Sequence, residues 1–324
     1  MRIGLCYDLR DDYIARGFTL EAASEFDVPE TIAALTEAIE AEGHVVEPIG
    51  ALPDLVGALA AGRRWPLVFN IAEGVAGIAR EAQVPALLEA YGIPFTFSSA
   101  DVLVVAMDKS LAKRVVRGAG VASPDFVVVR EVADLAGLAL PFPLFVKPLA
   151  EGTSKGVFEH SRIFDMRMLK DRVEALLEAY RQPVLVETYL PGREFTVGIL
   201  GTGRAARAIG VAEIGTRAGG DQAAYSHRNK MEGFDELTLA KGALAQAAAD
   251  TALAAWRALG ARDAGRVDIR CDRHGRPAFI EANPLAGLRP DWSELPILSK
   301  LSGMTYQRLI GAILEEAVAR MRAT

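Results

Sequence analysis

The chain has 324 residues, of which 51% are hydrophobic and 24% are charged. This length and composition suit two or three compact domains with a large buried interior, and they exclude a disordered chain. The formal net charge of −6 argues against non-specific nucleic-acid binding, which normally needs a basic surface.

Cysteine usage and the start of the chain indicate a cytoplasmic protein. Cys6 and Cys271 each lie in a strand-like run, as expected of buried residues in a reducing compartment and not of a disulfide framework. There is no CxxC or HExxH motif, so a zinc site is not expected. The sequence also lacks a signal-peptide pattern and an apolar run long enough to cross a bilayer, so no membrane partner is expected.

Strands and helices alternate in the first hundred residues. The expected strands are 2–9, 45–50, 65–74 and 94–99, and the expected helices are 29–44, 52–62 and 80–93. The first of these helices has Pro29 at its start and Gly43 at its end, where helices favour these residues. The alternation predicts a parallel sheet covered by helices on both faces.

The pattern changes after a helical connector at 101–121. The expected strands are then 124–130, 142–149, 156–160, 183–190, 194–201 and 206–215, with a helix at 164–182. A loop rich in Gly, Asp and Asn follows, and after it an Ala-rich helix at 238–259, a hairpin at 265–284 and a final helix at 304–322. We therefore expect an α/β domain followed by α+β units, with boundaries near residues 105 and 195.

The hairpin carries three oxygen-bearing side chains among apolar residues. Because side chains alternate along a strand, each strand is expected to present one set together: Arg266, Asp268 and Arg270 on the first, and Phe279, Glu281 and Asn283 on the second. Two carboxylates and an amide are hard oxygen ligands that suit Mg²⁺. A solvent-facing hairpin with ordinary surface charges explains the same residues.

A second candidate site is the segment FVKPLAEGTSKGV. Lys147 ends an apolar strand there, and the loop from Glu151 to Gly156 contains glycine, threonine and serine. Glycines let the backbone approach a phosphate, and hydroxyl groups add hydrogen-bond donors. The segment has neither the strand–GxxxxGK[ST]–helix order of a Walker loop nor a GxGxxG fingerprint. A plain hairpin turn is the alternative.

A third candidate is the segment VLVETYLPGREF. Glu187 ends an apolar strand, and Tyr189, Leu190, a Pro-Gly turn and Glu194 follow it. A chain that leaves a strand exposes backbone groups able to bind an adenine edge, and a carboxylate further along can hold ribose hydroxyls. A strand that ends in a β-turn is the alternative.

In this order the segments resemble the ATP-grasp enzymes, and most closely the D-alanine–D-alanine ligase family. The motifs that carry the resemblance are MDK, VKP..EGTS.G, VE.YL.G.EFTV.ILG, GRVDI and EANP..G, which span nearly the whole chain. The resemblance implies an ATP-grasp fold with an N-terminal parallel α/β substrate domain at 1–105. Two α+β subdomains that clasp ATP would follow, a central one at 106–195 and a C-terminal one at 196–324 with the metal and catalytic residues.

The resemblance also implies roles for single residues. The nucleotide-binding residues would be Lys109, Lys147 and Lys230 for the phosphates, Thr153 and Ser154 in the loop over the γ-phosphate, Glu187, Tyr189 and Leu190 for adenine, and Glu194 for ribose. Asp268, Glu281 and Asn283 would be ligands of two Mg²⁺ ions, with Mn²⁺ as an alternative metal. Arg266 would stabilise the phosphoryl group in transfer.

The implied activity is that of an ATP-dependent carboxylate–amine ligase acting on small amino acids or peptides. It would form an acylphosphate and then an amide bond, as in D-alanine–D-alanine ligase. Three alternatives stay open: a ligase for a different amino acid or short peptide, a phosphotransferase that stops at a phosphorylated product, and a non-catalytic ATP-binding relative. Relatives are commonly dimers, which implies a homodimer.

The substrate side departs from the family pattern. The residues that would stand at substrate positions are Glu25 or Asp27 in the first loop, Glu73 where a histidine is usual, and Gly287, Arg289 and Ser293 near the acceptor carboxylate. Lys155, Arg270 and Arg289 are extra cations near the expected pocket, and they predict a substrate more acidic than alanine. Ordinary solvated surface cations are the alternative.

Overall fold

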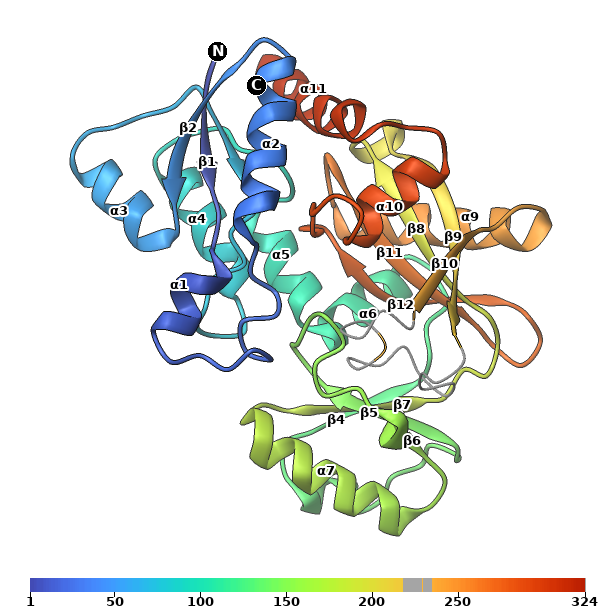
Figure 1. Ribbon diagram of the computed structural model, residues 1–324. Coiled ribbons are helices and arrows are strands. Elements are labelled where there is room, and N and C mark those ends of the chain that lie inside the picture. The colour runs from blue at the N-terminus through green and yellow to red at the C-terminus, as the bar shows by residue number, and fades with distance from the viewer. Residues whose placement is uncertain (218–228, 230–234, 324) are drawn as a thin grey trace.

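The computed structural model describes residues 1–217, 229 and 235–323, and Figure 1 shows three sheets with helices packed around them. The first sheet is parallel, with the strand order β2-β1-β3. Its strands are β1 (Arg2–Cys6), β2 (Val45–Gly50) and β3 (Leu67–Asn70), and its region holds α1 (Arg10–Ala15), α2 (Pro29–Ala41), α3 (Leu52–Ala60), the 3-10 turn η1 (Arg80–Ala82) and α4 (Gln83–Ala90). Apolar clusters form on both faces of this sheet, as the alternation predicts.

The expected fourth strand at 94–99 is wrong. Only one isolated bridge, between Val68 and Phe95, pairs this segment with β3. The chain turns away at Phe97, which has a φ of 69° and donates its backbone N–H to Asp263 Oδ2 at 2.8 Å. A residue in the left-handed region cannot continue an extended strand.

The expected single helix at 101–121 is two helices, α5 (Ala100–Met107) and α6 (Lys109–Gly118). Asp108 separates them in an extended conformation, and its Oδ1 accepts hydrogen bonds from the backbone N–H groups of the second and third residues of α6. This is an N-cap, which starts a new helix at Lys109. The helix α6 packs against α9 and β12 of the third sheet.

The second sheet is antiparallel, with the strand order β4-β7-β5-β6. Its elements are β4 (Phe126–Val129), η2 (Val132–Leu135), β5 (Leu144–Pro148), η3 (Glu159–Ser161), β6 (Arg162–Ile163), α7 (Met166–Tyr180) and β7 (Val184–Thr188). Helix α7 covers one face through a cluster that includes Leu169, Val173 and Leu176. The expected strand at 156–160 is wrong, because Gly156, with a φ of 73°, ends a turn at 153–156 and the chain then leads into η3.

The third sheet is antiparallel, with the strand order β10-β9-β8-β11-β12. Its elements are β8 (Glu194–Leu200), η4 (Gly203–Ala205), β9 (Arg207–Thr216), β10 (Asp235–Leu239), α9 (Ala243–Leu259), β11 (Ala264–Cys271), β12 (Pro277–Asn283), α10 (Glu294–Leu301) and α11 (Tyr306–Ala323). The helices α1 and α10 and the strand β10 were not predicted from the sequence. Figure 1 shows α11 beside α2, so the end of the chain packs on the first sheet's region.

Within residues 1–217, 229 and 235–323, no helix has both the length and the apolar character needed to cross a membrane.

Candidate active site

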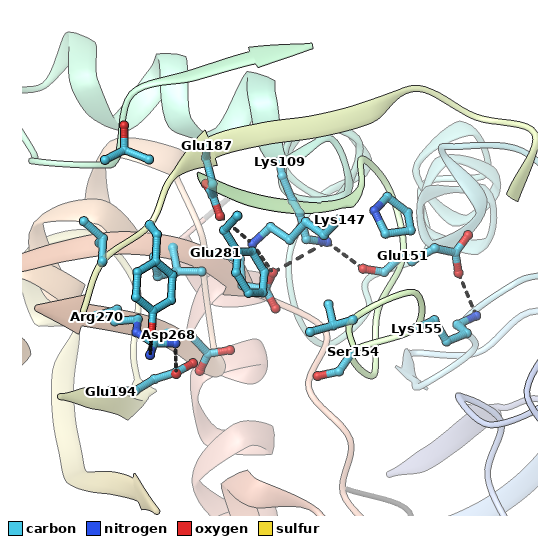
Figure 2. A pocket seen from close by; sticks show the side chains of 17 residues that line it. Lys109, Lys147, Glu151, Ser154, Lys155, Glu187, Glu194, Asp268, Arg270 and Glu281 are labelled. Carbon is cyan, nitrogen blue, oxygen red and sulfur yellow. Dashed lines mark hydrogen bonds and ion pairs between the residues drawn. The ribbon is translucent and has the colours of Figure 1, made fainter. Parts of the chain in front are cut away.

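A pocket lies between the second and third sheets, and Figure 2 shows the side chains around it. Of the residues expected to bind the nucleotide or the metal, nine line this pocket: Lys109, Lys147, Ser154, Glu187, Tyr189, Leu190, Glu194, Asp268 and Glu281. The fold therefore brings most of the expected nucleotide-binding residues to one pocket.

Glu187, which lines this pocket, lies between two lysines. Lys147, on β5, places Nζ 3.1 Å from Glu187 Oε1, and Lys113, on α6, places Nζ 2.9 Å from Oε2. Burial alone would raise the pKa of Glu187, but the two ammonium groups hold it below its usual value. Glu187 is therefore an anion between two cations.

Lys109 and Lys147 also approach Glu281, with Nζ atoms 3.5 and 3.9 Å from its Oε2. Burial opposes ionisation of Glu281, but these lysines bring its pKa below the usual value. Lys109 Nζ further donates a hydrogen bond of 2.6 Å to the carbonyl of Glu151. Positive and negative groups thus alternate from Lys109 through Glu281 and Lys147 to Glu187 (Figure 2).

Asp268 lies beside Glu281, because the two residues are direct partners across β11 and β12. Arg266 donates from one nitrogen to both oxygens of Asp268, at 3.0 and 3.1 Å, and Asn283 donates to Asp268 Oδ2 at 3.0 Å. The other terminal nitrogen of Arg266 donates to Glu294 Oε2 at 3.0 Å. The pKa of Asp268 is raised overall. Burial is the largest cause and the neighbouring Glu281 adds to it, while Arg266 acts in the opposite direction.

Asp268, Glu281 and Asn283 fit a magnesium site by the chemistry of their donor atoms. Two carboxylates and one amide supply oxygen ligands from one end of the hairpin, and Mg²⁺ completes its shell with water and phosphate oxygens. Among the residues that the structure describes, no group of three Asp, Glu, His or Cys side chains forms a metal centre. Metal binding here would therefore depend on the amide of Asn283 and on phosphate oxygens of a bound nucleotide.

A bulge in β12 determines which side chains face the pocket. Asp268 pairs with Glu281, but the next residue, Ile269, pairs with Phe279, so that Ile280 is the extra residue of β12. The expectation that Phe279 shares a face with Glu281 is wrong, because Phe279 is fully buried in the same core cluster as Ile269. The bulge sends the ring to the core and leaves the carboxylate at the pocket.

One end of the pocket combines an aromatic wall with an ion pair. The rings of Phe145 and Tyr189 are stacked with their centroids 6.4 Å apart. Arg270 donates to Glu194 Oε2 at 2.8 Å and to the hydroxyl of Tyr189 at 3.3 Å. An apolar wall beside a carboxylate suits a nucleobase and its ribose. Arg270 lines this pocket and not the substrate pocket described below, so its expected contribution to an acidic substrate is wrong.

The loop after β5 has an unusual backbone. Thr153 and Ser154 have φ values of 49° and 55°, and Gly156 has a φ of 73°. Left-handed conformations are uncommon for residues other than glycine and are found at ligand-binding loops. Ser154 lines the first pocket, and both Thr153 and Ser154 line a second one.

Glu25 accepts hydrogen bonds from two residues of this loop and from Arg80 of η1. Its carboxylate accepts from the backbone N–H of Gly152 at 3.0 Å, from Lys155 at 3.0 Å and from Arg80 at 2.9 and 3.2 Å. Lys155 is also paired with Glu151 at 2.8 Å. The expectation that Lys155 is a spare cation for an acidic substrate is wrong, because two carboxylates neutralise it.

A second pocket adjoins the first and lies between the N-terminal region and the third sheet. All six residues expected at the substrate, including both candidates of the first loop, line it: Glu25, Asp27, Glu73, Gly287, Arg289 and Ser293. Arg266 and Asn283 line it as well. Both pockets are lined by Ser154, Asp268 and Glu281, so a ligand in one would meet a ligand in the other at these residues.

The charged groups of the second pocket have both signs. Burial and neighbouring carboxylates raise the pKa of Glu73 well above its usual value, and burial raises that of Glu81 to about 7. Arg289 lies over the ring of Trp292, 5.1 Å from its centroid, and its backbone N–H donates to Ser293 Oγ at 3.1 Å. Of the three cations expected to favour an acidic substrate, Arg289 is the one that lines this pocket.

Among the residues that sequence reasoning missed, Glu81 and Glu294 line the second pocket, whereas Arg80 and Lys113 contact the site residues Glu25 and Glu187. Lys113 follows Lys109 by four residues, one helical turn, and this spacing was a usable signal for a shared helix face. The contacts of the other three arise from the tertiary fold and have no local signal. Lys230, expected at the phosphates, lies outside the described residues.

Comparisons with known proteins agree with the architecture. The family model for the C-terminal part of D-alanine–D-alanine ligases matches residues 115–315. Two crystal structures of the D-alanine–D-alanine ligase of Bacillus anthracis superpose on the whole chain and on 99% of theirs. One has a TM-score of 0.76 at 23% identity, and the other, complexed with ATP, has 0.73 at 22%. The predicted ATP-grasp fold is thereby confirmed.

Sequence relatives give the same family. The D-alanine–D-alanine ligase of Bordetella petrii is 35% identical over 243 residues, which are 73% of this chain and 72% of the relative. That of Gluconobacter oxydans is 34% identical over 297 residues, which are 89% of this chain and 93% of the relative. The chain described here therefore belongs to the D-alanine–D-alanine ligase family of ATP-grasp proteins.

Proposed function

We propose that the protein is an ATP-dependent ligase that joins the carboxylate of one small amino acid or peptide to the amine of another. The observation that carries this proposal is the shared wall of the two pockets, formed by Ser154, Asp268 and Glu281. ATP in the first pocket would place its γ-phosphate at this wall, and a carboxylate in the second pocket would meet it there. The family membership supports the same chemistry.

In the first step, an oxygen of the substrate carboxylate attacks the γ-phosphorus and the bond to the β–γ bridging oxygen breaks, giving ADP and an acylphosphate. Lys109 and Lys147 are positioned to hold the phosphates, and Thr153 and Ser154 to cover them. Mg²⁺ bound through Asp268, Glu281 and Asn283 would supply charge neutralisation at the phosphate oxygens. Such transfers depend on positioning and electrostatic stabilisation more than on covalent protein chemistry.

In the second step, the amine of the second substrate attacks the acyl carbon, inorganic phosphate leaves, and an amide bond remains. The amine loses a proton as the amide forms. Arg266 stands between Asp268 and Glu294 at the wall of the second pocket, where its guanidinium can stabilise the negative charge that develops on oxygen. Two carboxylates fix its orientation, so little rearrangement is needed during the reaction.

The test is ADP release by the protein with ATP and Mg²⁺ in the presence of D- and L-amino acids, singly and in pairs. D-alanine alone is expected to give ADP, phosphate and a dipeptide identified by mass spectrometry. ADP release that needs one amino acid but forms no amide would indicate a phosphotransferase instead. Absence of ATP turnover with every amino acid and pair would contradict the proposal.

A ligase for a different amino acid is the second candidate, and the charged lining of the second pocket favours it. Glu73, Glu81 and Arg289 surround a space where D-alanine would offer only a methyl side chain. The same panel of amino acids decides between the two candidates. We also propose, on the family resemblance, domain boundaries near residues 105 and 195, a homodimer, a cytoplasmic location, and Mg²⁺ or Mn²⁺ as the metal.

A further inference from the structure

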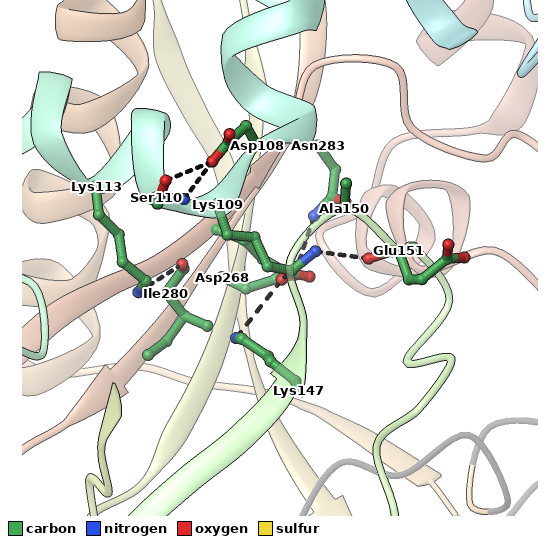
Figure 3. A network of polar contacts seen from close by, with 12 residues as sticks. Asp108, Lys109, Ser110, Lys113, Lys147, Ala150, Glu151, Asp268, Ile280 and Asn283 are labelled. Carbon is green, nitrogen blue, oxygen red and sulfur yellow. Dashed lines mark hydrogen bonds and ion pairs between the residues drawn. The ribbon is translucent and has the colours of Figure 1, made fainter. Parts of the chain in front are cut away.

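Lys113 is a fully buried lysine in α6, at the place where α6 meets the second and third sheets. Its Nζ lies 2.9 Å from Glu187 Oε2, an ion pair, and donates hydrogen bonds to the carbonyls of Ile280 at 3.0 Å and Phe279 at 3.5 Å. Figure 3 shows the contact with Ile280 to the left of Lys109 and Lys147. A buried ammonium group is costly unless such partners surround it, and Lys113 does not line either pocket.

The two carbonyls that Lys113 binds belong to the bulge of β12. The bulge places an extra residue, Ile280, opposite β11, and so disturbs the ladder of hydrogen bonds at this point. Buried carbonyls need a partner. Because Lys113 donates to the carbonyls of Phe279 and Ile280, it stabilises the backbone shape that turns Phe279 into the core and Glu281 toward the pocket.

The ammonium group of Lys113 also acts on Glu187, which lies on β7. Glu187 lies between Lys113 and Lys147, so its negative charge is shared by two cations. Without Lys113, Glu187 would be left with Lys147 as its cation and would hold it more strongly. Lys147 would then be less available to a phosphate group.

We propose that Lys113 is a positioning residue of the nucleotide site, which sets the orientation of Glu281 and the availability of Lys147 without touching the nucleotide. This inference rests on the proposed function, because it takes the first pocket as the ATP site. It explains why a lysine is placed where a neutral side chain would be cheaper to bury. It also makes Lys113 the link between Glu187 on β7 and the bulge of β12, the strand whose Glu281 and Asn283 would bind the metal.

The test compares the variant K113M with V116A, which truncates another fully buried side chain of the same helix. Isothermal titration with ADP and Mg²⁺ is expected to give a Kd about tenfold higher or more for K113M and an unchanged Kd for V116A. The KM for ATP should rise by a similar factor, and the KM for the amino-acid substrate should change less than about twofold. A folded K113M that binds the nucleotide like the wild type would overturn the inference.

Two further measurements cover a K113M protein that does not fold. The variant K113M/E187Q removes one charge of each sign and avoids an unpaired buried carboxylate. It should bind ADP and Mg²⁺ more weakly than E187Q, because the carbonyls of the bulge have lost their donor; equal binding would contradict the role of Lys113. Hydrogen exchange of the free protein should be faster at 279–281 in K113M/E187Q than in E187Q, and equal exchange would contradict the stabilised bulge.

Nucleotide binding by the wild type and by the Lys113 variants distinguishes failure of the proposed function from failure of the role of Lys113. A wild-type protein that binds neither ATP nor ADP would remove the nucleotide site and the proposed function with it. A wild-type protein that binds and turns over ATP, together with Lys113 variants of unchanged affinity, would leave the proposed function in place and remove the inference alone.

Discussion

Glu25 and Lys155 form an ion pair of 3.0 Å across 130 residues of sequence. The pair joins the segment after α1 to the loop that carries Thr153 and Ser154, and Arg80 lies on the other side of the same carboxylate at 2.9 Å. All three side chains are at least nine-tenths buried. Glu25, which was expected at the substrate, therefore already has internal partners, and its main effect should be on the loop.

The variant E25A is expected to destabilise the protein by about 3 kcal/mol, because Arg80 and Lys155 lose a buried counter-charge. Burial opposes ionisation of Glu25, but Arg80 and Lys155 keep its pKa below the usual value, so the charged form is the one removed. Urea denaturation followed by circular dichroism measures the change. The matched control is E21A, an exposed glutamate of the same segment. A loss in E25A no larger than in E21A would contradict the network.

The variant R266K should retain nucleotide binding and lose catalysis. A lysine keeps the positive charge between Asp268 and Glu294 but cannot donate to both of them and to Thr196 at once, as Arg266 does. We expect kcat to fall by about 10²–10³, with the Kd for ADP and Mg²⁺ within about threefold of the wild type. An unchanged kcat would show that Arg266 has a structural role only.

The stability of the protein should depend on pH through Asp27. Burial raises the pKa of Asp27 to about 7, against the opposing charges of Arg10 and Arg289, and an unfolded chain has a value of about 3.9. Between these values the folded protein holds the extra proton, so Asp27 stabilises the fold at acidic pH, and this contribution is lost as the pH rises toward 7.

The variant D27N removes this proton equilibrium. Relative to the wild type, D27N should become more stable, with a larger free energy of unfolding, as the pH rises from about 4 to about 7. Denaturation curves at several pH values measure the difference between the two proteins. The control is D11N, an exposed residue of α1. A difference between D27N and wild type that is constant with pH would contradict a raised pKa at Asp27.

Local patterns predicted most of the strands, and the family resemblance implied the residues that line the first pocket, but neither predicted the contacts that orient them. Alternation of side chains placed Asp268 on a polar strand face, and the same rule failed at Phe279, because a bulge shifts the register by one residue. The pairing of Lys113 with Glu187 and of Glu25 with Lys155 depends on elements distant in sequence. No local period encodes such contacts, and neither pairing was predicted from the sequence.

The prediction of a substrate more acidic than alanine now depends on Arg289. Its guanidinium lies over Trp292, and its side chain lines the second pocket beside the wall shared with the nucleotide pocket. If it binds a carboxylate of the substrate, R289A should raise the KM of the preferred amino acid by about tenfold with a smaller change in kcat, because binding is lost equally in the ground and transition states. Steady-state ADP release with the best substrate of the amino-acid panel measures both constants. The matched control is R276A, an exposed arginine in the turn of the hairpin. An unchanged KM in R289A would mean that Arg289 only packs on Trp292 and that the substrate is recognised by other residues of the pocket.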